Sequence, residues 1–157
     1  MHGLKNRVAI VTGGAPIIGA VITQRLEAEG ATVACASRNA KESISATAQN
    51  AGKIFAVTMD LADEVSIRAA FAEVHKNAGA PQILIANASL RDGLSMDFEK
   101  ISHKEFSQLF DVDIAGHFLC ARLLAENLPA GQSGSIVFLS SIYAIAGMDV
   151  GMYSPGM

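Results

Sequence analysis

A glycine-rich segment near the start of the chain has the residue types and the spacing to hold a phosphate group. The apolar, β-branched run 8–11 is typical of a buried parallel strand, and a helix-like pattern begins soon after Gly13 and Gly14. Glycines at such a junction let the backbone turn tightly and approach a ligand closely. The helix beyond them offers free N–H groups and the positive end of its dipole to an anion. We therefore expect a dinucleotide cofactor on the residues of this turn, namely Gly13, Ala15, Pro16, Ile17, Ile18 and Gly19.

Length, charge and composition exclude several classes of protein. The 157 residues, half of them hydrophobic, suit a single domain over residues 1–157 with a buried core. The net charge of −3 and the absence of a Lys/Arg cluster argue against a nucleic-acid partner. No run approaches the roughly 18–20 apolar residues that cross a bilayer, and no signal-peptide pattern opens the chain. We therefore expect neither nucleic acid nor a membrane among the partners.

The cysteines and histidines do not form a metal-binding pattern. Cys35 and Cys120 lie far apart in the sequence and are typical of buried thiols in a reducing cytoplasm. His75, His103 and His117 fall on helix-like segments, where we interpret them as surface or packing residues. The expected protein is cytoplasmic and holds no metal.

The elements that must position the glycine turn alternate between strand-like and helix-like segments. This alternation predicts an α/β fold, a Rossmann-like doubly wound parallel sheet with the strand order 3-2-1-4-5. The glycine turn then lies at the carboxyl edge of strand one, where such sheets bind ligands. The expected strands are residues 7–12, 31–37, 53–59, 82–87 and 135–140. Three expected helices are residues 17–29, 41–50 and 102–128. A further helix is expected to begin after Asp63 and to end at residues 77–79.

Local signals support three of these helices. Asp63 is a suitable N-cap, and Ser102 with Glu105 matches a capping box. The widest loop, 88–101, leaves strand four on the side where a substrate is expected. Four apolar residues share one face of the first helix and are expected to pack on the sheet: Ile18, Val21, Ile22 and Leu26.

Four motifs at matching spacing resemble those of the short-chain dehydrogenase/reductase family, and the resemblance covers residues 5–141. The motifs are the glycine turn 12–19, the acidic-apolar pair 60–61, the segment 86–89 after strand four, and the fifth strand with its end, 134–141. The resemblance implies that Asp60 and Leu61 hold the adenine of the cofactor and that Ser141 is the catalytic serine. It also implies that the segment Asn87, Ala88 and Ser89 lies under the cofactor.

The same resemblance implies an oxidoreductase that transfers a hydride between a nicotinamide cofactor, NAD or NADP, and a small carbonyl or alcohol substrate. It further implies a homo-oligomer. In this family an acidic residue near position 37 favours NAD, whereas Ser37 stands there with Arg38 beside it. An arginine can pair with the 2′-phosphate of NADP, so these two residues favour NADP over NAD.

Three positions depart from the family pattern. Ile17 replaces the middle glycine of the turn, and Asp113 stands where the family has an asparagine that relays protons. Tyr153 follows Ser141 at about the interval of the catalytic tyrosine, but Met157 stands where the pattern requires a lysine. Asp113 and Tyr153 are therefore candidate catalytic residues. Asp113 brings a charge that asparagine lacks, and the alternative is that it is only a partly buried helix residue.

Two interpretations of the last departure remain open. In the first, Tyr153 is the catalytic acid. In the second, the segment 140–144 begins a longer loop, as in some family members, and the catalytic tyrosine and lysine lie beyond Met157. The second predicts that the C-terminal part of the usual fold is missing and that the apolar strand 136–139 is an uncovered edge. A catalytically inactive nucleotide-binding or oligomer-forming relative is the alternative to an enzyme.

Overall fold

The computed structural model describes residues 3–14, 17–39, 53–90 and 98–147. Its centre is a parallel sheet of five strands in the order β3-β2-β1-β4-β5, which confirms the predicted order and fold class. The strands are β1 Val8–Thr12, β2 Thr32–Ser37, β3 Ile54–Thr58, β4 Ile83–Ala86 and β5 Ser135–Phe138. The helices are α1 Ile17–Ala28, α3 Glu64–Ala78, α4 His103–Phe110 and α5 His117–Asn127, with short turns η1 Phe98–Lys100 and η3 Ile142–Ala144. The predicted helix 41–50 lies outside the described residues.

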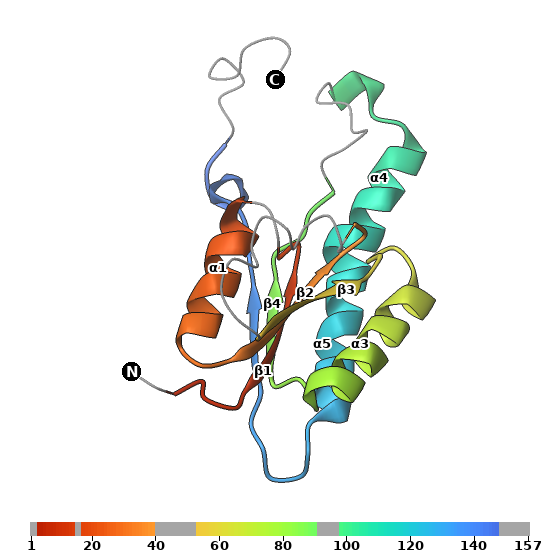
Figure 1. The fold of residues 1–157 in the computed structure, drawn as a ribbon. Helices are drawn as coiled ribbons and strands as arrows, with labels where there is room; N and C mark the ends of the chain where they lie inside the picture. The colour runs from red at the N-terminus through yellow and green to blue at the C-terminus, as the bar shows by residue number, and fades with distance from the viewer. Residues whose placement is uncertain (1–2, 15–16, 40–52, 91–97, 148–157) are drawn as a thin grey trace.

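The central strand β1 is buried on both faces, as its unbroken run of apolar residues predicts. Its side chains alternate between two cores, because successive residues of a strand point to opposite faces. Val8 and Ile10 belong to the larger core under α3 and α5, whereas Ala9 and Val11 belong to the smaller core under α1. Figure 1 shows α1 on one side of the sheet and α3 and α5 on the other.

Helix α1 presents a different face to the sheet from the one expected. Gly19 and Thr23 are buried, and Ile22 and Leu26 pack on the smaller core as predicted. The predicted core residues Ile18 and Val21 are exposed instead. The reason is local, since the Thr23 hydroxyl donates a hydrogen bond to the Gly14 carbonyl at 3.1 Å and thereby turns this face of α1 toward the glycine turn.

The predicted helix 102–128 is helical throughout, but it is interrupted by a π-turn. The capping box at its start is present, because the Ser102 hydroxyl accepts from the Glu105 N–H and the Glu105 carboxylate accepts from the Ser102 N–H. Between α4 and α5 the segment Asp111–Gly116 is a π-helix, η2. The sequence predicted one continuous helix here and did not predict the π-turn. The π-turn matters for function, because such turns are frequent at functional sites and this one contains Asp113.

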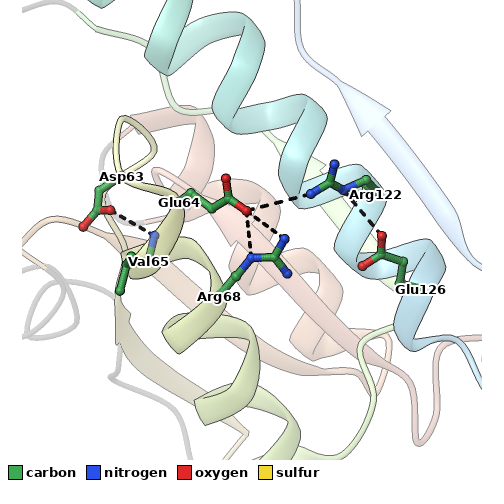
Figure 2. Close-up of polar contacts among 6 residues, drawn as sticks. All are labelled: Asp63, Glu64, Val65, Arg68, Arg122 and Glu126. Atoms are coloured by element: carbon green, nitrogen blue, oxygen red, sulfur yellow. Dashed lines mark hydrogen bonds and ion pairs between the residues drawn. The ribbon is translucent and has the colours of Figure 1, made fainter.

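Helices α3 and α5 are joined on the outside of the molecule by a chain of charges, shown in Figure 2. Glu64 pairs with Arg68 one turn later at 2.7 Å and approaches Arg122 of α5 at 3.9 Å. Arg122 also pairs with Glu126 at 3.4 Å, and Asp63 caps α3 by accepting from the Val65 N–H at 2.9 Å. Exposed pairs of this kind contribute little stability each, so they orient the helices over a core that apolar residues hold together.

Strand β5 is uncovered in the part of the chain that the structure describes. It pairs with β4 on one side, and every residue from 131 to 147 is exposed. Its apolar side chains include Val137 and Phe138, which are about half exposed, although a strand of this composition is normally buried. The predicted uncovered apolar edge is therefore present.

Candidate cofactor-binding site

A cavity of about 330 Å³ opens at the carboxyl ends of β1, β2, β3 and β4. Ligands of open α/β sheets bind at this edge of the sheet. The cavity brings together most of the sequence-predicted cofactor residues that the structure describes, namely Gly13, Ile17, Ile18, Ser37, Arg38, Asp60, Leu61, Asn87, Ala88 and Ser89. Gly19 is a buried residue of α1 that packs on Gly13, and Ala15 and Pro16 lie outside the described residues. That these residues bind a cofactor stays a prediction.

The glycine turn is held in place by the exit of β4. Gly13 has a φ of 62°, a conformation that favours glycine. The Asn87 side-chain amide donates to the carbonyls of Thr12 and Gly13, each at 3.0 Å. A Cβ on Gly19 would lie 1.9 Å from the Gly13 carbonyl oxygen, so only glycine allows α1 to approach the turn this closely. Gly13 and Gly19 therefore pack directly against each other beside the cavity.

Ile17 is strained at the rim of this cavity. Its φ is 45°, and a β-branched residue in the left-handed region is a conformational outlier that costs roughly 1–2 kcal/mol. The residue is 77% exposed and lines the cavity at the first position of α1. The chain therefore keeps an unfavourable residue at the point where a phosphate would meet the helix N-terminus.

We expect the substitution Ile17→Gly to raise the free energy of unfolding by about 0.5–1 kcal/mol, because relief of strain exceeds the entropy cost of a glycine. Chemical denaturation measures this change. Val21→Gly is the matched control, since Val21 is exposed on the same helix without a positive φ. That control should lose about 0.5–1 kcal/mol, as glycines inside helices do. Equal losses in both variants would contradict the strain at Ile17.

The far end of the cavity carries polar groups from β2 and β3. Ser37 ends β2, and the exposed Arg38 follows it at the rim. Asp60 comes two residues after β3, where one of its carboxylate oxygens accepts from the Ala62 N–H at 3.0 Å. The Asp60 N–H in turn donates to the Ser66 hydroxyl at 2.9 Å, which fixes the loop before α3. A cation and a carboxylate thus face this end of the cavity together.

The carboxylate of Asp113 is engaged by the loop after β4. One oxygen accepts from the Ser89 hydroxyl and the other from the Leu90 N–H, each at 2.9 Å. Ser89 and Leu90 both line the cavity, so the π-turn fixes the position of its wall. Asp113 was predicted as a catalytic residue. In this structure it holds the loop, and a catalytic role stays a prediction.

Sequence reasoning missed the contacts of His117, which it interpreted as a surface or packing residue. The side chain is buried, and its Nε2 lies 3.2 Å from the Thr12 hydroxyl. Its Nδ1 lies 3.2 Å from the carbonyl oxygen of Asp113, one turn earlier. Burial lowers the pKa of this imidazole, although the hydrogen bond to the Asp113 carbonyl and the Asp113 charge oppose that change. The sequence contained one signal for these contacts: His117 follows Asp113 by four residues, so the two residues share one face of a helix.

Of the other predicted catalytic residues, Ser141 lies three residues after β5 and Tyr153 lies outside the described residues. The Ser141 hydroxyl caps η3 by accepting from the Tyr143 N–H at 3.2 Å. Ser141 is exposed and is absent from the residues that line the cavity. Of the three predicted catalytic residues, Asp113 and Ser141 therefore lie in the described part of the chain, and their catalytic roles stay predictions.

The described residues contain no group of three or more His, Cys, Asp and Glu side chains placed to hold a metal ion. None of the helices in the described ranges is long and apolar enough to span a membrane.

Comparison with known proteins decides the family. The family model for short chain dehydrogenases matches residues 7–154, nearly the whole chain. The chain belongs to the short-chain dehydrogenase family. Its sequence is 29% identical over 151 residues to a 2,5-dichloro-2,5-cyclohexadiene-1,4-diol dehydrogenase of Sphingobium indicum, which covers 96% of this chain and 60% of that protein. It is also 29% identical over 140 residues to the 3-oxoacyl-[acyl-carrier-protein] reductase MabA of Mycobacterium tuberculosis, covering 87% of this chain and 51% of the reductase.

Solved structures of the family share this fold. A short chain dehydrogenase from Burkholderia cenocepacia, crystallised in complex with NADP, superposes with a TM-score of 0.81 at 29% identity and covers 93% of this chain and 60% of its own. A short-chain dehydrogenase/reductase mutant from Serratia marcescens gives 0.77 at 29% identity over 90% of this chain and 58% of its own. The chain thus spans about 60% of the length of such relatives. The short-chain dehydrogenase family supports a dehydrogenase or reductase role.

Proposed function

We propose that the chain is the nucleotide-binding part of an oxidoreductase that uses NADP, in preference to NAD, to interconvert a small carbonyl compound and its alcohol. The observation that carries the proposal is the cavity, in which the glycine turn, Arg38 and Asp60 meet at the carboxyl edge of the sheet. The Burkholderia relative with the same fold holds NADP, which supports this choice of cofactor. Titration with NADPH, followed by the fluorescence of the cofactor itself, tests the proposal.

The residues present fit a nicotinamide dinucleotide. The N–H groups of the first turn of α1 would face a phosphate of the cofactor, and the contact between Gly13 and Gly19 brings the start of α1 close to the glycine turn. Asp60 and Leu61 would hold the adenine, while Ser37 and Arg38 would hold the adenosine ribose and its 2′-phosphate. The nicotinamide ring, when bound, supplies or accepts the hydride.

The chain's own groups would control the reacting oxygen of the substrate. In this proposal the Ser141 hydroxyl donates a hydrogen bond to that oxygen and orients the carbonyl. A proton must reach the same oxygen, and an unperturbed tyrosine, with a pKa of about 10, needs a nearby positive charge to deliver it near neutral pH. Tyr153 is followed at the required spacing by Met157 and not by a lysine. We therefore place the proton donor outside residues 1–157 and keep Tyr153 as the alternative.

We expect Arg38→Ala to weaken NADPH binding roughly tenfold while NADH binding changes little, because only NADPH offers a 2′-phosphate to the guanidinium. Calorimetric titration of both cofactors measures the effect. Arg25→Ala is the control, since Arg25 is exposed on α1 and pairs with Glu29 away from the cavity. If the wild-type chain binds both cofactors equally, the proposed preference is wrong.

A catalytically inactive nucleotide-binding relative is the second candidate function. The strained Ile17 at the cavity and the engaged carboxylate of Asp113 favour it, because Ile17 departs from the family's glycine turn and Asp113 from its catalytic asparagine. The two candidates differ in a simple way. Both bind NADPH, but only the enzyme oxidises it when a carbonyl substrate is added to a chain that carries the proton donor.

We also propose that the protein forms a homo-oligomer through an apolar stripe on α4, η2 and α5. The stripe consists of Phe106, Phe110, Ile114 and Phe118, each more than half exposed. A four-residue repeat drifts around an α-helix of 3.6 residues per turn, and the wider π-turn reverses the drift, so the four side chains stay on one face. Contiguous exposed apolar surface of this kind is typical of an interaction site.

We expect Phe110→Asp to lower the mass of the assembly in sedimentation analysis, because a charge at the centre of the stripe opposes burial. Val65→Asp is the control, since Val65 is exposed on α3, outside the stripe. A wild-type protein that sediments as a monomer at every concentration contradicts the oligomer.

For the cellular location we propose the cytoplasm, where buried free thiols such as Cys35 and Cys120 stay reduced.

A further inference from the structure

The buried imidazole of His117 joins two parts of the site that lie 105 residues apart in the sequence. We propose that His117 is a positioning residue that holds the glycine turn against the π-turn, and that it does so only as the neutral ring with its proton on Nδ1. His117 itself is absent from the residues that line the cavity, so it acts through Thr12 and Asp113. The effect on cofactor binding rests on the proposed function, whereas the proton position does not.

The hydrogen bonds of Thr12 determine where the imidazole proton lies. The Thr12 hydroxyl oxygen accepts from the N–H groups of Asn87 and Ala88, at 3.0 and 3.1 Å, which uses both of its lone pairs. Its remaining partners are His117 Nε2 at 3.2 Å and the Ile85 carbonyl at 3.4 Å. If Nε2 carried a proton, it would be a third donor to the Thr12 oxygen and would find no free lone pair. Nε2 must therefore accept the hydroxyl proton of Thr12. The single proton of the neutral ring is then on Nδ1.

The π-turn supplies the partner for that proton. The backbone N–H of His117 donates to the Ile114 carbonyl, and the carbonyl of Asp113 instead receives the Nδ1–H of the ring. The carboxylate of the same Asp113 holds Ser89 and Leu90 at the cavity wall. One side chain therefore connects the β1 turn, the exit of β4 and the π-turn, and the cavity is built on all three.

Protonation of the ring would break this connection. A second proton on Nε2 would point at the Thr12 oxygen, where it meets two other donors and no lone pair. The ring packs on Phe138 of β5 in a T-shaped arrangement, with 6.5 Å between centroids. Asp113 is the one charged group of the described residues that favours the protonated form. Burial outweighs that charge and keeps the pKa below its ordinary value of about 6.5. The contribution to folding is thus complete above about pH 6.5 and is lost as the pH falls through the folded-state pKa.

Nuclear magnetic resonance of the ring nitrogens tests the proton position without any cofactor. Long-range proton–nitrogen correlation near neutral pH should show a pyrrole-like Nδ1 and a pyridine-like Nε2 for His117. The exposed His103 of α4 provides the internal reference spectrum. A proton on Nε2 of His117 would overturn the inference, whether or not the chain binds NADPH.

NADPH titration from about pH 5 to about pH 8 tests the positioning role. The wild type should lose affinity as the pH falls through the folded-state pKa of His117, which lies below about 6.5. At neutral pH His117→Phe should bind roughly tenfold more weakly than the wild type, because the Thr12 hydroxyl loses its nearer acceptor and the Asp113 carbonyl loses the Nδ1–H. The affinity of His117→Phe should not show the acid loss of the wild type. His117→Gln, whose amide oxygen can accept from Thr12 without titrating, should bind well and show no such loss at acid pH. His103→Gln should keep the wild-type profile.

The two proposals fail in different ways. A wild type that never binds NADPH contradicts the proposed function, and the nitrogen spectrum then still decides the proton position. A wild type that binds NADPH with the same pH profile as His117→Phe overturns the positioning role. Circular dichroism at each pH checks that every variant is folded during the titration.

Discussion

A polypeptide of these 157 residues is expected to bind NADPH and to leave small ketones unreduced at any useful rate. The reason lies in proton delivery, because no lysine follows Tyr153 at the spacing that would lower the pKa of its hydroxyl. General acid catalysis contributes roughly 10²–10⁴-fold, so its loss is plain in an assay. The rate of NADPH absorbance loss, with and without a ketone, measures the result.

The control for this result is a longer natural form with a tyrosine and a lysine four residues apart beyond position 157. That form should reduce the ketone, and Ser141→Ala should then abolish most of its activity while NADPH binding is kept. Rapid ketone-dependent oxidation of NADPH by the 157-residue polypeptide would contradict the expected inactivity. If Tyr153→Phe abolished that oxidation, Tyr153 would be the proton donor.

The second large effect is expected at Gly116, the last residue of the π-turn. A Cβ at this position would lie 2.3 Å from the carbonyl oxygen of Leu61 and 2.8 Å from its Cβ. Helix propensity alone predicts that Gly116→Ala stabilises by about 1 kcal/mol. We expect the opposite sign, a loss of about 3 kcal/mol in the free energy of unfolding, because backbone must move to relieve the overlap.

The same substitution should also weaken NADPH binding, because Leu61 lines the cavity. Gly147→Ala is the matched control, since a Cβ there has no atom within 4 Å. Its unfolding free energy should stay within about 0.5 kcal/mol of the wild type. Urea denaturation measures both variants, and a stabilised Gly116→Ala would show that helix propensity exceeds the cost of the contact with Leu61.

The strands and their order could be predicted from the sequence because parallel strands carry their signal locally. Unbroken apolar runs such as residues 8–11, bounded by glycine or polar residues, have few other structures available to them. Caps behave in the same way, since Asp63 and Ser102 each satisfy N–H groups two or three residues away. Strands and caps depend on residues that are neighbours in the sequence, and the predictions of both are confirmed by the structure.

The features that the sequence did not reveal depend on residues far apart. His117 contacts Thr12 across 105 positions, and the Asp113 carboxylate contacts Ser89 across 24. The exposure of Ile18 depends on how Thr23 meets the Gly14 carbonyl, which no periodicity of α1 contains. Local patterns therefore predicted the elements around the site, and three-dimensional contacts determined the roles of side chains within it.

The strand order has a consequence for synthesis on the ribosome. The central strand β1 is made before the other strands, but it pairs with β4 only after a long stretch of chain has followed. Ile10, for example, lies opposite Leu84, 74 residues later. Until then one edge of this buried, apolar strand stays open in the nascent chain. Closing so long a loop is slow compared with local folding, so this strand is a natural binding point for chaperones during translation.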